Sequence, residues 1–349
     1  MRPLLRRNHL YRNVRAADTL ELFFVVSVAT VLVTRLYLHL TNYPEVGGRT
    51  LHVAHMLPGG FLMLAAMILM FSVLGYRAQR FGAILGGIGF GLFIDELGKF
   101  ITQDNNYFFQ PTIALIYLLF VGLLMAIRQL SRRRGLNQPE SLLNALFLLE
   151  EAVIHDLDEA EKRHALSYLR KSDPSHPLVN PLIQALEATA AQPVPRPSWW
   201  TTAHTHLTKW YQKFIVAAWG LRLFVAGVVA KTTWEVVTVA LALLPWLQGG
   251  VLEAPPLVIV LELISALTVA AITARAVLIF SDNRARAYDL LQRAVLIDIF
   301  ITQFFAFYRE SLEALPLLVM NLLIYTTVRF LASEERRARP IDANQRKIT

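Results

Sequence analysis

The chain contains 349 residues, of which 55% are hydrophobic and only 17% charged, and its mean hydropathy is +0.43. Soluble domains of this size are more polar, so the composition predicts an all-α, polytopic membrane helix bundle. A net charge of +8 would suggest nucleic acid as a partner of a soluble protein. Here the basic residues follow membrane topology instead, which disfavours nucleic acid. The absence of cysteine excludes disulfides, thiolate metal sites and thiol nucleophiles.

Apolar runs of the length that crosses a bilayer, about 20 residues, recur along the chain. They predict eight transmembrane helices, and the first of them is expected to be a retained anchor rather than a cleaved signal peptide. The predicted spans cover residues 17–40, 51–75, 81–102, 111–130, 223–247, 257–280, 290–308 and 312–331.

Basic residues concentrate in alternate connections between these spans. Arginines crowd residues 1–16 before the first span, residues 131–134 after the fourth, and the tail at 332–349. The opposite connections carry few basic residues. By the positive-inside rule, both termini are expected to be cytoplasmic, in a plasma (inner) membrane.

A polar region separates the two sets of four spans, 17–130 and 223–331. Residues 131–198 predict a small cytoplasmic helical insertion that ends in a proline-rich linker, and its helices at 135–191 are a candidate surface for a cytoplasmic protein partner. Residues 199–222 predict an amphipathic helix at the membrane interface, because the segment combines tryptophan and tyrosine with lysine, which all favour that interface.

Ionisable residues inside the predicted spans are informative because each costs roughly 2.5–3.5 kcal/mol to insert. Most of them fall towards the outer face under the predicted topology. The resulting candidate site for a proton, an ion or a small polar solute consists of Arg35, Asp95, Glu96, Lys99, Glu262 and Asp298.

The third predicted span links this layer to the helix packing. Ala83, Gly87, Gly91, Asp95 and Lys99 follow one line along a helix at intervals of four residues. Small residues mark places where helices approach closely in membranes. We therefore expect this face to pack inside the bundle, with Asp95 and Lys99 pointing inward.

The later spans carry further polar residues. Lys231 and Glu235, four residues apart, predict an internal ion pair. Asp298 has no such local partner, so it must face the bundle or be protonated. The remaining polar side chains are expected to hold helices together by hydrogen bonds, namely Thr302, Gln303 and Asn321.

Two histidines raise the alternative of a metal centre. His52 and His55 share a helix face and could bind zinc together with Asp95 or Glu96. Such a centre would suit an intramembrane enzyme that acts on a lipid or a lipid-linked substrate.

The leading hypothesis is therefore a transporter-like or channel-like membrane protein with a polar site in the outer leaflet. A metal-dependent enzyme and a membrane scaffold or sensor that acts through residues 135–191 are the two alternatives. The sequence contains no phosphate-binding loop, serine-hydrolase elbow or potassium-filter motif. The intramembrane charges also admit a purely structural interpretation, as a buried ion-pair network.

Overall fold

The computed structural model describes residues 11–41, 55–97, 111–130, 135–153, 157–192, 199–247 and 256–338. All regular elements in these ranges are helices, which confirms the all-α prediction. The chain divides into two compact units, Met1–Glu96 with Gly122–Trp199, and Leu97–Val121 with Trp200–Thr349.

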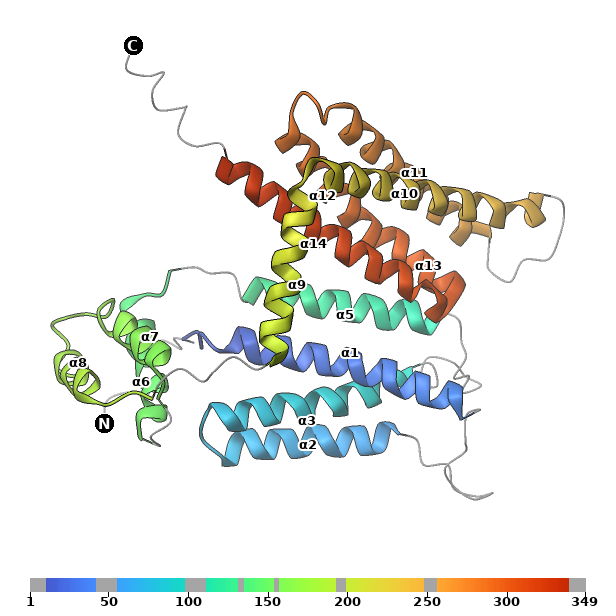
Figure 1. Cartoon of the computed structure of the whole chain (residues 1–349). Helices are drawn as coiled ribbons and strands as arrows, with labels where there is room; N and C mark the ends of the chain where they lie inside the picture. The colour runs from blue at the N-terminus through green and yellow to red at the C-terminus, as the bar shows by residue number, and fades with distance from the viewer. Residues whose placement is uncertain are drawn as a thin grey trace, which may run out of the picture. The chain divides into compact units, whose positions relative to one another are not determined.

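In the first unit, α3 (Tyr76–Asp95) is the central helix. Both α1 (Ala16–Leu40) and α2 (Met56–Ser72) pack against it along their lengths (Figure 1). The predicted small face of α3 lies at these contacts, with Ala83, Gly87 and Gly91 all buried. Asp95 continues this face and is fully buried, so its predicted inward orientation is confirmed.

The close approach of α2 and α3 depends on two glycines that face each other. A Cβ atom on Gly59 would lie 2.7 Å from the carbonyl oxygen of Gly89, and a Cβ atom on Gly89 would lie 2.8 Å from the backbone nitrogen of Met63. Real Cβ atoms do not come this near to backbone atoms, so larger residues would force the helices apart.

The described part of the insertion contains three short helices, α6 (Gln138–Val153), α7 (Glu159–Leu169) and α8 (Val179–Ala188). Asp158 caps α7, because its side chain accepts hydrogen bonds from the backbone of residues 160 and 161 while Glu161 reaches back to the nitrogen of Asp158. Leu157, Leu169 and Leu186 form the centre of a small core that joins these helices.

In the second unit, α11 (Pro256–Leu278) packs against α10 (Ala218–Leu247), α12 (Arg284–Ile297) and α13 (Gln303–Glu310). A π-helical turn, Asp298–Thr302, joins α12 to α13. A 3₁₀ turn, Ser311–Ala314, then leads into α14 (Leu315–Ala338), which packs back on α12. Helix α5 (Pro111–Leu130) is divided between the two units at residues 121 and 122.

Five helical segments among the described residues are long and apolar enough to cross a membrane. These segments support the interpretation that the chain is a membrane protein. The eight-span topology remains a prediction. One segment of 53 residues, Arg284–Arg336, covers both of the last two predicted spans. The chain reverses within it at Ser311, which has a positive φ of 53°. The apolar α2 has 17 residues and is shorter than the five, and the glycine-rich α3 is not among them.

The break between helices in this region lies several residues before the division predicted at residues 222 and 223. The segment predicted to lie at the membrane interface forms α9 (Trp199–Val216), and α10 begins at Ala218, so the chain turns at Ala217 (Figure 1). The turn is closed by the backbone nitrogen of Ala217, which donates to the carbonyl oxygens of Lys213 and Phe214 at 3.3 and 3.2 Å. Gly220 allows the new helix to pass close to the Phe214 backbone.

The glycine contact between α2 and α3 gives a paired prediction. Gly59→Ala should lower the free energy of unfolding by about 1–3 kcal/mol, because the added methyl group overpacks a backbone contact. Gly60→Ala should change it little, because nothing lies within 4 Å of a Cβ atom built on Gly60. Thermal unfolding of the detergent-purified variants measures both, and equal stabilities of the two variants would contradict this packing.

Candidate functional site

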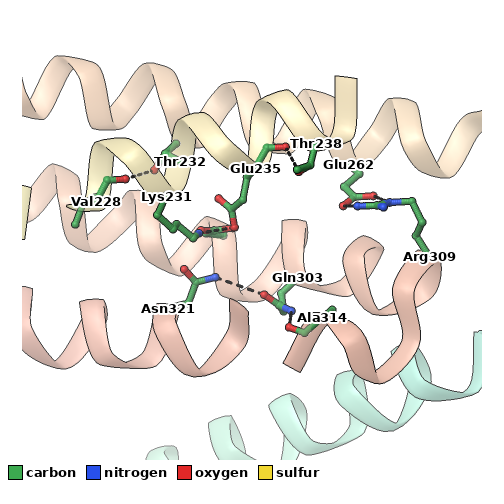
Figure 2. A network of polar contacts seen from close by, with 11 residues as sticks. Val228, Lys231, Thr232, Glu235, Thr238, Glu262, Gln303, Arg309, Ala314 and Asn321 are labelled. Atoms are coloured by element: carbon green, nitrogen blue, oxygen red, sulfur yellow. Dashed lines mark hydrogen bonds and ion pairs between the residues drawn. The ribbon is translucent and has the colours of Figure 1, made fainter. Parts of the chain in front are cut away.

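The second unit contains a buried cluster of one lysine and two carboxylates. Lys231 and Glu235 lie one turn apart on α10, and the Lys231 Nζ atom is 2.5 Å from Glu235 Oε1 (Figure 2). Lys231 also forms an ion pair with Asp298, which lies 67 residues further along the chain. The predicted Lys231–Glu235 pair is thus confirmed. All three side chains are at most 4% exposed.

Asp298 gains its position from the π-helical turn that it begins. A π-helical turn contains one more residue than an α-helical turn and therefore shifts the face that the helix presents to its neighbours. Asp298 and Thr302, the first and last residues of this turn, are both buried. The carbonyl oxygen of Ile299, inside the turn, accepts a hydrogen bond from the hydroxyl of Tyr117 on α5. Such turns occur frequently at functional sites.

The cluster has more hydrogen-bonding capacity than partners. Within the described residues, Asp298 Oδ1, Thr302 Oγ1 and Asn321 Oδ1 are buried and make no hydrogen bond of good geometry, although the Thr302 and Asn321 side chains lie beside the Asp298 carboxylate. Glu235 Oε2 is also buried and has no hydrogen-bond partner. Buried polar atoms are almost always satisfied in folded proteins, so four such atoms around one cluster require an explanation.

The ionic charges of the cluster do not balance either. One lysine faces two carboxylates, which leaves one negative charge when all three groups are ionised. An uncompensated charge in a low-dielectric interior costs several kcal/mol. The cluster therefore favours the uptake of one additional positive charge.

Next to this cluster, Gln303 and Asn321 hold the end of the helical hairpin together. Gln303 Nε2 donates to the carbonyl oxygen of Ala314 at 2.8 Å, and Asn321 Nδ2 lies 3.5 Å from Gln303 Oε1 (Figure 2). These contacts join α13, α14 and the 3₁₀ turn between them. They agree with the predicted structural role of both amides.

Glu262 on α11 has a partner of its own. The Arg309 guanidinium binds its carboxylate with two hydrogen bonds of 2.9 Å (Figure 2). Arg309 also contacts Glu310 at 2.5 Å. Because a bidentate pair satisfies the carboxylate in charge and geometry, Glu262 is better suited to fixing α13 on α11 than to binding a ligand.

The first unit contains a separate polar cluster at the end of α3. Arg35 on α1 donates from Nε to Asp95 Oδ1 at 2.6 Å and from a terminal nitrogen to the Asp95 carbonyl oxygen at 3.1 Å. His55 Nε2 lies 3.1 Å from the other carboxylate oxygen. Glu96 accepts a hydrogen bond of 2.8 Å from the backbone nitrogen of Met56, the first residue of α2. Arg35, Asp95 and Glu96 thus come together as predicted, and each has a structural partner.

Two residues of the predicted site, Lys99 and His52, lie outside the described residues. The metal-centre hypothesis therefore stays a prediction in its original form. Within the ranges that the structure describes, there is no group of three or more histidine and acidic side chains suited to a metal ion. His55 contacts both carboxylates, with its Nδ1 atom 3.9 Å from Glu96 Oε1.

Comparisons with known protein families, known proteins and solved structures find no match. Function must therefore be inferred from the two clusters themselves. The first-unit cluster has an arginine, a histidine and a helix terminus as partners for its two carboxylates. The cluster of Lys231, Glu235 and Asp298, hereafter the lysine–carboxylate triad, is the one with unsatisfied oxygen atoms and unbalanced charge.

The triad predicts a strong dependence on its lysine. Lys231→Met should lower the free energy of unfolding by about 3–5 kcal/mol, because it leaves two carboxylates buried without a counter-charge. The loss should shrink as the pH falls and the carboxylates become protonated, and a second change, Asp298→Asn, should restore part of it. Arg222→Met, at an exposed position of the same helix, is the control. Unfolding curves in detergent at several pH values give the measurement, and equal effects of Lys231→Met and Arg222→Met would contradict the ion-pair geometry.

Proposed function

We propose that this chain is a multi-pass membrane protein that translocates protons, and that the lysine–carboxylate triad is the group that binds and releases them. The observation that carries the proposal is a single lysine shared by two buried carboxylates, surrounded by unsatisfied oxygen atoms. Ionisable residues inside a membrane bundle usually mark the path of an ion or a proton.

A proton fits this site better than a metal cation. The ammonium group of Lys231 already contacts both carboxylates and would repel a second cation placed there. A proton needs no such space, because it binds covalently to one carboxylate oxygen. Its addition leaves one carboxylate and one lysine, so the cluster becomes neutral.

The same residues also support release of the proton. When a proton leaves, Lys231 stabilises the second negative charge, because it remains in contact with both carboxylates. Thr302 and Asn321 place a hydroxyl and an amide beside the Asp298 carboxylate. Groups of this kind can hydrogen-bond to water or to a protonated carboxyl group, and they therefore favour transfer from the site.

The proposed proton-binding site retains only one residue of the candidate site predicted from the sequence. Asp298 becomes the central group, with Lys231 and Glu235 added to it. Asp95, Glu96 and Arg35 are assigned to a second cluster, and Glu262 to helix packing. We retain the cytoplasmic orientation of both termini and the plasma membrane as parts of the proposal, on the strength of the charge distribution. The protein-binding role of residues 135–191 also stays a prediction.

Proton flux tests the proposal directly. Proteoliposomes that contain the full chain and an internal pH-sensitive dye should acidify when an inward proton gradient is imposed and the membrane potential is clamped. Asp298→Asn and Glu235→Gln should each reduce the rate to that of protein-free vesicles, because neither amide can exchange a proton in this range. Asp289→Asn is the matched control, since Asp289 lies on α12 with its side chain 56% exposed.

Two outcomes would overturn proton translocation by the triad. One is a wild-type rate equal to that of empty vesicles. The other is an unchanged rate in Asp298→Asn. Size-exclusion profiles of each variant show whether a lost rate reflects loss of the folded protein.

A further inference from the structure

A hollow of about 890 Å³ lies in the second unit between α9 and the last turns of α14. Its volume falls within the range of sites that bind small molecules. The hollow shares no residue with the triad, so its role is independent of proton translocation. The residues of its lining that matter here are Lys209, Trp210, Lys213 and Val216 of α9, and Phe330 and Glu334 of α14.

The wall that α9 supplies is held in place by contacts on the other side of this helix. The hydroxyl of Tyr211 lies 2.5 Å from the hydroxyl of Thr327 on α14. One turn later, Ile215 is buried in the core that Leu291 and Val328 also form. Figure 1 shows α9 running across the direction of α14. The hollow is therefore bounded by two helices in fixed contact, as expected of a preformed site.

Helix α9 presents three chemically distinct sides. Successive residues of an α-helix are rotated by about 100°, so Tyr211 and Ile215 share the packed side. Lys209 and Lys213, four residues apart, share a second side, and both are exposed. Trp210 lies on a third side and is 65% exposed. An exposed aromatic side next to a cationic side favours a membrane interface, where both kinds of group are stable.

The two lysines give the hollow a net positive charge. Among the described residues that line it, Glu334 is the only carboxylate, so two lysines face one acidic group. Neither lysine side chain has an ion pair or a hydrogen bond with the described part of the chain. Both ammonium groups can therefore bind an anionic ligand, and His206 adds a ring nitrogen to the same lining.

The hollow also lies at the level where the predicted membrane span of α14 ends. Phe330 and Glu334 stand on either side of residue 331, the last residue of that span. The predicted topology places this end at the cytoplasmic surface, whose anionic lipids attract basic residues. The apolar part of the lining, with Val216 and Phe330, lies beside the cationic part. The lining thus has the two chemistries of a phospholipid.

We propose that this hollow binds one anionic phospholipid, with its phosphate between Lys209 and Lys213 and an acyl chain along Val216 and Phe330. Lysine ammonium groups are common ligands of phosphate oxygens. A head group with a net negative charge balances the excess of positive charge in the lining. A zwitterionic head group does not, because its own cation faces the two lysines.

Native mass spectrometry of the full chain in a non-ionic detergent tests the proposal with two lipids that have identical acyl chains. Phosphatidylglycerol should bind once per chain and about tenfold more tightly than phosphatidylcholine, because two lysines near a membrane surface each contribute about 1 kcal/mol towards an anionic lipid. Inorganic phosphate at equal concentration should not displace the lipid, because it makes no apolar contact.

Three variants separate this site from a general attraction of anions. The double variant Lys209→Gln, Lys213→Gln should lower the affinity for phosphatidylglycerol to that for phosphatidylcholine. Glu334→Gln should raise the affinity for phosphatidylglycerol, a gain that loss of folding does not produce. Arg329→Gln is the matched control and should leave the affinity unchanged, because Arg329 is exposed at the same level of α14 but does not line the hollow.

Any of four results would overturn the proposal. They are equal affinities of the wild-type chain for the two lipids, an unchanged preference in the double lysine variant, a loss in Arg329→Gln as large as in that variant, and displacement of the lipid by inorganic phosphate. The last result would identify the hollow as a site for free phosphate. Proton flux is measured separately with the triad variants, so these results do not depend on the outcome for the proposed function.

Discussion

The second unit is organised around a buried lysine that forms ion pairs with two carboxylates in a nearly solvent-free interior. Lys231 can reach Asp298 only because α10 is held by α11, which in turn packs on α12 and on the π-helical turn. The turn presents Asp298 inward, and the hydroxyl of Tyr117 donates a hydrogen bond to the carbonyl oxygen of Ile299, the residue after Asp298. Loss of any of these supports would leave a buried charge without its partner, which is strongly destabilising in a membrane bundle.

The two polar clusters illustrate different uses of buried charge. In the first unit, Asp95 receives an arginine and a histidine, and Glu96 receives the backbone nitrogen at the start of α2. These contacts join the ends of three helices. In the triad, by contrast, Lys231 contacts one oxygen atom of each carboxylate, and Asp298 Oδ1 and Glu235 Oε2 make no hydrogen bond of good geometry. Complete satisfaction is what a structural role requires, whereas the deficit of donors and positive charge in the triad supports our proposal that it exchanges a proton.

Local sequence spacing predicted what depends on helix geometry. The line of small residues on α3 correctly indicated a packed face that ends at Asp95, and the four-residue spacing of Lys231 and Glu235 correctly indicated an ion pair. Local spacing could not identify Lys231 as the partner of Asp298, because the two residues are 67 positions apart. Nor could it identify Arg309 as the partner of Glu262, 47 positions away. Both pairings depend on how helices associate, and the π-helical turn that orients Asp298 has no signature in the hydrophobic pattern. Grouping charges by estimated depth therefore combined residues that belong to different clusters.

Infrared difference spectroscopy of the reconstituted protein during a pH titration tests most directly whether the triad exchanges a proton. It detects the carbonyl stretch of a protonated carboxyl group separately from the bands of the carboxylate. We predict one such band that appears as the pH falls, shifts in ²H₂O, and is lost or displaced in both Asp298→Asn and Glu235→Gln but not in Asp289→Asn. A band that is the same in all four proteins, or no titrating band at all, would contradict the assignment of the triad as the proton-binding site.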